Sequence, residues 1–352
     1  MAKTILIKNF SNSAGNSVDI RLSYQFYGRK PEEAPVILVN HALTGNSIVT
    51  GKNGWWKDLI GEDKCIDLRK FCVLAFNIPG NGYNGQYFEN YKHFKLKDIA
   101  RIQALGLDEI GINKLFAIIG GSIGGALAWE LAVLRPELAE HVIPVASDYK
   151  STDWLVANCR IQDHILNNSI NPVSDARMHA MTFYRTPQSL SQKFQGKRNS
   201  QNRSFEVENW LLHHGEKLKN RFTLRAYKLL NHLLTTIDIS NGSGEYLEAA
   251  SRIQGEIHIV TVNSDLFFLA EENRKTYREL VAIKQNVYLH EINSIHGHDA
   301  FLIETEQLTD FLKPVFESKI NPTHYNPKSQ PSSEVNFNED KAGYTTLHKI
   351  ES

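Results

Sequence analysis

The stretch LFAIIGGSIGGALAWELA (residues 115–132) places one serine, Ser122, inside a run of glycines. The apolar residues before the glycines are typical of a buried strand, and those after them are compatible with a helix. Gly120, Ser122 and Gly124 fit the pattern G-x-S-x-G, in which a serine occupies a sharp turn between a strand and a helix. Glycine two residues before and two residues after the serine removes side chains that would clash there. The stretch therefore predicts a nucleophilic serine presented at the end of a strand.

Length and composition place limits on the kind of protein. The chain has 352 residues, a formal net charge of zero and a hydrophobic fraction of 41%, which suits one large core or two domains. The balanced charge argues against nucleic-acid or anionic-membrane partners. We expect no membrane span, because no apolar run approaches ~20 residues. We expect no signal peptide, because the first residues lack a long apolar run followed by a small-residue cleavage site. Three cysteines without CxxC spacing favour a reducing compartment, so we expect a cytoplasmic protein.

Short apolar runs alternate with helical patterns over most of the chain. Residues 18–28 alternate in polarity and predict an antiparallel strand near the N-terminus. Buried parallel strands are predicted at residues 35–40, 71–77, 115–119, 141–147, 256–262 and 286–292. Helices are predicted at residues 94–112, after Ser122, near 271–282 and near 300–317. This alternation predicts an α/β fold with a mostly parallel sheet and helices on both faces, built from residues 1–148 and 250–317.

The alternation is interrupted between residues 149 and 249. Four segments there have helical periodicity and none has a strand pattern. We therefore expect this segment, named the lid below, to be an all-helical insertion. Residues 318–352 are polar and poor in aliphatic side chains, a composition typical of disordered chain.

A nucleophilic serine needs a base and a carboxylate that orients the base. In this arrangement the three residues follow the order serine, acid, histidine along the chain. Asp265 directly follows the predicted strand 256–262, and His296 and His298 both lie in the loop before the last helix. The spacing in His296-Gly-His298-Asp299 does not fit a zinc site, so no metal is expected.

Two backbone N–H groups must bind the oxyanion that forms during acyl transfer. One should belong to Ile123, which follows the serine, and the other to the loop after an early strand. That loop is NHALTGN (residues 40–46), and Leu43 is the expected donor.

The segments NHALTGNS, GGSIGGALAWELA, ARMHAMTFYRT, NSDLFF and HGHDAFLIE resemble the homoserine O-acetyltransferase family. The resemblance runs in order from about residue 22 to residue 312. It implies an α/β-hydrolase fold and transfer of an acetyl group from acetyl-CoA to Ser122 and then to the γ-hydroxyl of homoserine, early in methionine biosynthesis. It implies the catalytic triad Ser122, Asp265 and His298. It also implies small-molecule substrates, acetyl-CoA as co-substrate with no other cofactor, and it leaves a homodimer open.

The resemblance also implies two substrate-binding residues. Arg185 would hold the carboxylate of the amino-acid acceptor, for which a planar guanidinium is suited, and Asp299 would hold its ammonium group. From the residues alone, Arg185 could equally be a surface arginine at a helix end, and Asp299 could be a helix N-cap.

Several alternatives remain open on the sequence. The glycine-rich segment IPGNGYNGQYFENY and the stretch before ARMHA are shorter than is usual in the family, and Arg225 interrupts a further family segment. These differences leave open succinyl-CoA as an alternative donor and serine as an alternative acceptor. A plain serine esterase would keep the triad and oxyanion hole without needing Arg185 or Asp299. A non-catalytic binding protein would need none of these residues.

Overall fold

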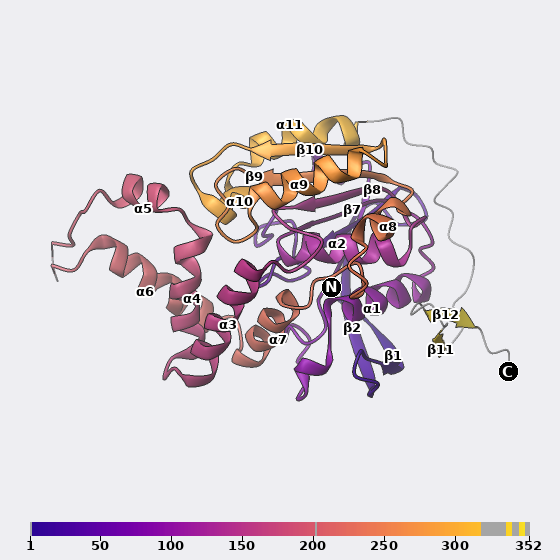
Figure 1. Cartoon of the computed structure of the whole chain (residues 1–352), viewed down its shortest axis with the longest axis horizontal. Coiled ribbons are helices and arrows are strands. Elements are labelled where there is room, and N and C mark those ends of the chain that lie inside the picture. Colours follow the sequence, from indigo (N-terminus) through magenta and orange to yellow (C-terminus); the bar gives the residue numbers. More distant parts are fainter. Residues whose placement is uncertain (1, 201–202, 318–335, 340–344, 349–352) are drawn as a thin grey trace.

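A single large sheet organises the fold. The computed structural model describes residues 2–200, 203–317, 336–339 and 345–348. Eight strands pair in the order β1-β2-β6-β3-β7-β8-β9-β10 (Figure 1). Their bounds are β1 (Lys3–Ser11), β2 (Ser17–Gly28), β3 (Val36–Asn40), β6 (Cys72–Phe76), β7 (Leu115–Gly121), β8 (Ala139–Val145), β9 (Glu256–Val262) and β10 (Val287–Ile292). Two residues each form β4 (Ile60–Gly61) and β5 (Ile66–Asp67), which pair with each other.

The sheet is mostly parallel, as predicted. All neighbours from β6 to β10 run parallel, whereas β2 is antiparallel to both β1 and β6. The parallel strands are buried on both faces and therefore consist of nearly continuous apolar residues, such as VILVN in β3. Their carboxyl ends meet at one edge, where sites form in open α/β sheets.

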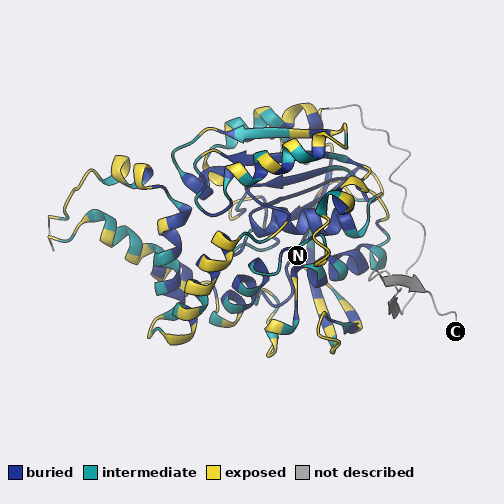
Figure 2. Ribbon diagram, viewed as in Figure 1, coloured by how far each residue is buried: buried dark blue, intermediate teal, exposed yellow. Residues whose placement is uncertain are grey.

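Helices cover both faces of the sheet and create two cores. The helices outside the lid are α1 (Leu96–Glu109), α2 (Ile123–Leu134), α9 (Ala270–Val281), α10 (Ala300–Ile303) and α11 (Thr305–Phe316), with 3-10 turns η1 (Tyr91–His93) and η2 (Gly297–Asp299). Val36 and Leu38 of β3 pack in the core that includes α1 and α2, whereas Ile37 and Val39 pack in the core that includes α11. Figure 2 shows this buried centre between more exposed outer helices. The two cores therefore bury both faces of the sheet.

The chain between β8 and β9 is helical. It contains α3 (Asp153–Asn168), α4 (Pro172–Tyr184), α5 (Pro187–Phe194), α6 (Glu206–Lys219), α7 (Leu224–Leu234) and α8 (Tyr246–Ser251). Thr152, Thr186 and Thr223 begin three of these helices, because each side chain accepts a hydrogen bond from an N–H in the first turn. Most of the lid projects to one side of the sheet (Figure 1). The predicted inserted helical lid is therefore present.

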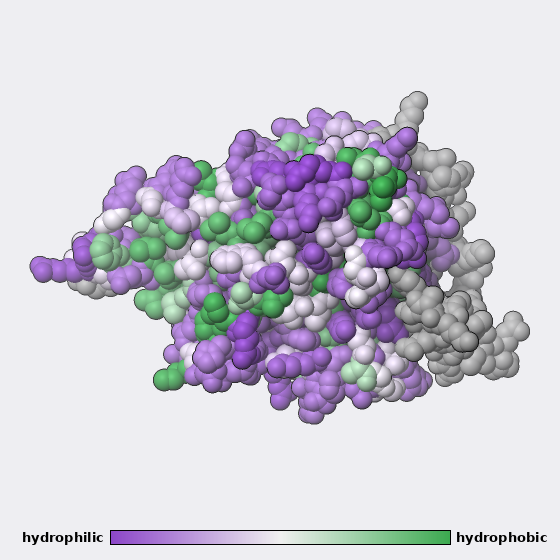
Figure 3. Space-filling model, in the orientation of Figure 1, coloured by the Kyte–Doolittle hydropathy of each residue, from purple (hydrophilic) through white to green (hydrophobic). Residues whose placement is uncertain are grey.

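Two predictions need qualification. The last helix, predicted near residues 300–317, is divided at Glu304 into α10 and α11. The disorder predicted for residues 318–352 falls largely outside the described residues; within that segment β11 (Asn336–Glu339) and β12 (Thr345–His348) pair antiparallel. Among the described residues, no helix combines the length and apolarity needed to cross a membrane. Figure 3 shows a largely hydrophilic face with apolar groups scattered across it.

Candidate active site

Ser122 occupies a strained turn at the carboxyl end of β7. Its φ of 59° and ψ of −128° lie where side-chain-bearing residues are rarely found. Such strain persists only where the surrounding structure enforces it, and it is concentrated at functional sites. The turn ends β7 and starts α2 within one residue, which places the serine directly before a helix N-terminus.

The glycines around Ser122 are required by close backbone contacts. A Cβ atom on Gly120 would lie 2.2 Å from the carbonyl oxygen of Gly124. A Cβ atom on Gly124 would lie 2.4 Å from the carbonyl oxygen of Asn40, at the end of β3. The clash predicted two residues on either side of the serine is therefore present, and Gly124 also allows α2 to approach the loop after β3.

Three polar side chains meet in a hydrogen-bonded chain beside α2. The Nε2 atom of His298 lies 2.9 Å from Ser122 Oγ, and its Nδ1 atom lies 2.7 Å from Asp265 Oδ2. Asp265 follows β9 and His298 lies in η2 after β10, so all three come from the same edge of the sheet. The other carboxylate oxygen of Asp265 accepts the N–H groups of Phe267 and Phe268, at 2.7 and 3.0 Å. This geometry lets the imidazole accept the serine proton while the carboxylate keeps the ring oriented.

His296 has a different partner. Its Nδ1 atom lies 2.9 Å from the hydroxyl of Ser189 on α5. Of the two histidines in this loop, the structure brings only His298 to Ser122 and Asp265.

The loop at residues 40–46 is anchored by a buried histidine. His41 Nδ1 lies 2.8 Å from the carbonyl oxygen of Ala42, and its Nε2 atom accepts the N–H of Ile78 at 3.0 Å. Burial lowers the pKa of His41 to about 4, so the ring is neutral at pH 7 and can serve as donor and acceptor at once. Within the described part of the chain, the N–H groups of Leu43 and Ile123 donate no hydrogen bond. Both remain available to an oxyanion.

A charged pair lies next to the triad. Arg185, which follows α4, places Nε 3.5 Å from Oδ2 of Asp299, the residue after His298. The Nη1 atom of Arg185 is buried and has no hydrogen-bond partner among the described residues. Burial raises the pKa of Asp299, while the charges of Arg177 and Arg185 oppose that rise. Arg177, on α4, was not recognised from the sequence.

Comparisons with known proteins agree with this geometry. The family described as alpha/beta hydrolase fold matches residues 35–228. A homoserine O-acetyltransferase from Chloroherpeton thalassium is 31% identical over 335 residues, covering 88% of this chain and 86% of that protein. The chain belongs to the homoserine O-acetyltransferase family.

Solved structures confirm the fold. The structure of homoserine O-acetyltransferase from Bacillus anthracis aligns with a TM-score of 0.81 at 19% identity, covering 91% of this chain and 98% of that one. Esterase E22 aligns with a TM-score of 0.79 at 17% identity, covering 90% and 100%. Transferases and esterases therefore share this fold, and the site residues must distinguish the two activities.

Aromatic rings enclose the imidazole in this member of the homoserine O-acetyltransferase family. The ring centroids of four side chains lie within 5.3–5.6 Å of the His298 ring: Tyr184, Phe267, Phe268 and Phe301. These rings fix the orientation of the imidazole and keep water from its faces. Sequence reasoning did not identify them as a group, although each lies in a quoted segment: TFYR, NSDLFF or HDAFL.

The lid contacts both halves of the site. Arg221, between α6 and α7, donates to the carbonyl oxygen of Thr44 at 2.8 Å, next to Leu43. The indole N–H of Trp154, on α3, donates to the carbonyl oxygen of Leu266 at 2.6 Å, next to Asp265. These contacts link the lid to the loop at residues 40–46 and to the segment that carries Asp265.

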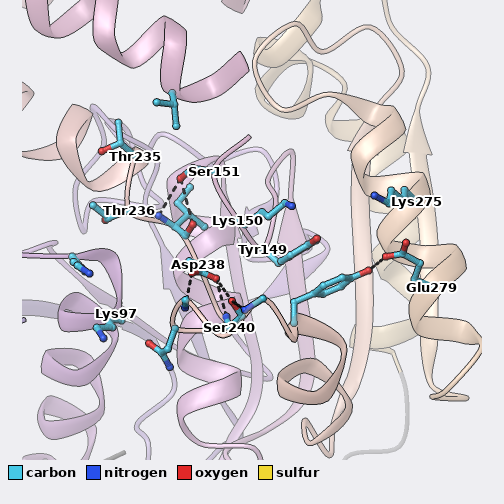
Figure 4. Close-up of a pocket in the computed structure, with 17 residues that line it drawn as sticks. Lys97, Tyr149, Lys150, Ser151, Thr235, Thr236, Asp238, Ser240, Lys275 and Glu279 are labelled. Carbon is cyan, nitrogen blue, oxygen red and sulfur yellow. Dashed lines mark hydrogen bonds between the residues drawn. The ribbon is translucent and has the colours of Figure 1, made fainter. Parts of the chain in front are cut away.

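A separate cavity of about 670 Å³ lies between the lid and the core. Figure 4 shows its lining, which includes Lys97, Lys150, Asp238 and Lys275. None of the triad residues lines it. We therefore do not assign it to the acyl-transfer chemistry.

Proposed function

We propose that the protein transfers an acetyl group from acetyl-CoA to the γ-hydroxyl of L-homoserine through an acetyl-Ser122 intermediate. The names of its relatives supply the reaction. The observation that carries the proposal is the Arg185–Asp299 pair beside the triad. An esterase has no use for opposite charges at that position, whereas an amino acid carries a carboxylate and an ammonium group. The free cysteines Cys65, Cys72 and Cys159 support a cytoplasmic location.

The first half-reaction loads the serine. His298 Nε2 takes the proton of Ser122 as Oγ attacks the thioester carbonyl, and the N–H groups of Leu43 and Ile123 bind the resulting oxyanion. The tetrahedral intermediate collapses with cleavage of the carbon–sulfur bond. His298 returns its proton to the departing sulfur, so free CoA and acetyl-Ser122 are the products.

The second half-reaction uses the same groups in reverse. The homoserine carboxylate binds Arg185, whose Nη1 atom has no partner within the described part of the chain, and its ammonium group binds Asp299. Each charge of the substrate replaces one contact of the existing ion pair. His298 then takes the proton of the γ-hydroxyl as that oxygen attacks the acyl carbon. The acyl–Oγ bond breaks, the proton returns to Ser122, and O-acetylhomoserine leaves.

One experiment separates this proposal from its competitors. The purified protein is assayed with acetyl-CoA or succinyl-CoA, each with homoserine, serine or no acceptor. Intact-mass spectra follow the enzyme after mixing with donor alone and after acceptor is added. We expect an acetyl adduct that homoserine removes, and no adduct on Ser122→Ala. Hydrolysis of acetyl-CoA without acceptor at the rate seen with homoserine would establish an esterase. Faster transfer from succinyl-CoA or to serine would assign that compound as the donor or acceptor instead.

A further inference from the structure

Two histidines and a glutamate meet at the sheet edge opposite the triad. His141 lies near the amino end of β8, and Glu256 and His258 lie at the amino end of β9. His141 and Glu256 are direct partners in the parallel ladder. Glu256 and His258 are two residues apart on one strand, so their side chains share a face of the sheet. The pairing of β8 with β9 therefore brings the three side chains together.

Their potential ligand atoms form a nearly equilateral triangle. His141 Nδ1 lies 3.2 Å from Glu256 Oε2, His258 Nε2 lies 3.4 Å from the same oxygen, and the two nitrogens are 3.4 Å apart. Two neutral imidazoles sharing one carboxylate by hydrogen bonds alone would bring the nitrogens closer to the oxygen, to about 2.7–3.0 Å. The observed spacing is longer, and it is uniform.

That spacing matches one face of a coordination tetrahedron. Zinc bound at about 2.0–2.2 Å in tetrahedral geometry has ligand atoms separated by about 3.3–3.5 Å. An octahedral ion at about 2.1 Å, such as Mg²⁺, requires a closer separation of about 3.0 Å. Imidazole nitrogen is also a ligand of zinc, copper and nickel rather than of magnesium or calcium. The spacing and the ligand chemistry therefore both favour a tetrahedral transition-metal ion of the zinc class over magnesium or calcium.

The electrostatic state of the cluster suits a cation. His141 and His258 each offer an imidazole nitrogen, and Glu256 offers a carboxylate oxygen. Within the described residues, the ion-pair contacts of Glu256 are limited to these two rings. Its negative charge thus lacks a cationic partner.

Buried polar atoms at the cluster are left without hydrogen bonds. His258 is 5% exposed, and its Nδ1 atom has no partner among the described residues. The same holds for Nε2 of His290, whose ring is stacked on that of His258 with centroids 5.8 Å apart. An unpaired buried polar group costs about 1–3 kcal/mol. These two nitrogens are not the ligand atoms of the cluster, so they show a costly polar environment beside it and the ligand geometry carries the inference.

We propose that His141, Glu256 and His258 bind one tetrahedral transition-metal ion of the zinc class, with water as the fourth ligand. The side chain of Glu256 is 39% exposed, which gives the ion a path from solvent. The bound ion joins β8 to β9, the two neighbouring strands between which the lid is inserted. Its role is structural, since the triad lies at the other edge of the sheet. The proposal is independent of the acetyltransferase assignment.

The test uses the full chain, stripped of metal with a chelator. Zn²⁺ is titrated in competition with a chromophoric chelator, and Co²⁺ is added separately to report geometry by its visible absorption. We expect one Zn²⁺ per chain, tetrahedral Co²⁺ bands, little competition from Mg²⁺, and a midpoint of thermal unfolding that rises with Zn²⁺ concentration.

Variants assign the site. Glu256→Gln and His141→Gln should lose the Co²⁺ bands and weaken Zn²⁺ binding at least 10-fold. His164→Gln removes an exposed histidine on α3 and should bind as the wild type does. Because Glu256 is partly exposed, its variant should fold, which circular dichroism can verify. Absence of binding to the wild type, or equal binding by Glu256→Gln and His164→Gln, would overturn the proposal.

Discussion

The hydroxyl of Ser122 and the imidazole of His298 lie at hydrogen-bond distance, 2.9 Å apart. This contact distinguishes His298 from His296, two residues earlier, which contacts Ser189 instead. We expect His298→Ala to lower kcat by several powers of ten, because among the described residues His298 is the base that contacts the Ser122 hydroxyl. His296→Ala should retain most of the activity, since it removes only the contact to Ser189. Steady-state assays of the two variants check this, and the reverse pattern would refute the assignment of the base.

Arg185 should affect the acceptor and not the donor. Arg185→Ala should lower kcat/KM for homoserine about 100-fold, equivalent to about 3 kcal/mol for a lost charge-assisted pair. The rate at which acetyl-CoA acylates Ser122 should change little, because the thioester carries no group that needs this guanidinium. Stopped-flow release of CoA measures the first step, and product formation measures the second.

A suitable control for Arg185 is Arg160→Ala. That arginine is exposed on α3 and pairs with Asp163 on the same helix. Equal homoserine kinetics in the two variants would show that Arg185 does not bind the acceptor.

At the scale of elements, the approach of α2 to the loop after β3 depends on a missing side chain. Gly124→Ala would place a Cβ atom 2.4 Å from a backbone oxygen of Asn40, and neither backbone can move without displacing Ser122 or the oxyanion loop. We expect a loss of about 2–4 kcal/mol in the free energy of unfolding and a large fall in kcat. Gly61→Ala is the control, because its nearest neighbour is the flexible side chain of Lys64 at 3.1 Å. Denaturant titrations that give the same stability for both variants would contradict this explanation of the glycine.

The strands that could be predicted from the sequence are those whose burial leaves a regular apolar pattern. The buried parallel strands were predictable because burial on both faces makes them continuously apolar. β1 was missed because its register shifts between Ile7 and Phe10, with Asn9 at a φ of 52°, so that its buried residues are three apart and strict alternation is lost. The division of the last helix at Glu304 was not predicted, because no glycine or proline stands at that position.

Some residues of the candidate site could likewise be predicted from the sequence and others could not. Ser122, Asp265 and His298 were predictable because the order of strands fixes where each must lie, and the structure brings them together. Arg177 and the aromatic rings around His298 were not, since packing brings them together from the lid, from the segment after β9 and from α10. The cluster of His141 and His258 depends on pairing between strands far apart in sequence and has no spacing motif.

At the scale of the whole molecule, one buried carboxyl couples stability to pH. Glu130 on α2 accepts the N–H of Asp238 in the lid, and burial raises its pKa from 4.5 to about 7. Because the folded state holds this proton more tightly than the unfolded state, the free energy of unfolding should fall as pH rises from about 4.5 to about 7. A shift of this size corresponds to about 3 kcal/mol.

Glu130→Gln keeps the acceptor oxygen and removes the ionisation. Urea titrations at pH 5 and pH 8 should therefore show a smaller loss of stability for the variant than for the wild type. An identical pH dependence for both proteins would show that Glu130 does not ionise in this range.

The insertion of the lid between β8 and β9 also determines the delay between the synthesis of these two neighbouring strands. Roughly 110 residues separate the end of β8 from the start of β9, so at about 5–20 residues per second a ribosome needs roughly 5–20 s to supply the partner strand. During that interval β8 has an open edge, and Ser122 has neither its acid nor its base. The nascent chain must therefore keep an aggregation-prone strand edge covered before it can become active. The rate of translation and the access of chaperones thus become part of how this enzyme matures.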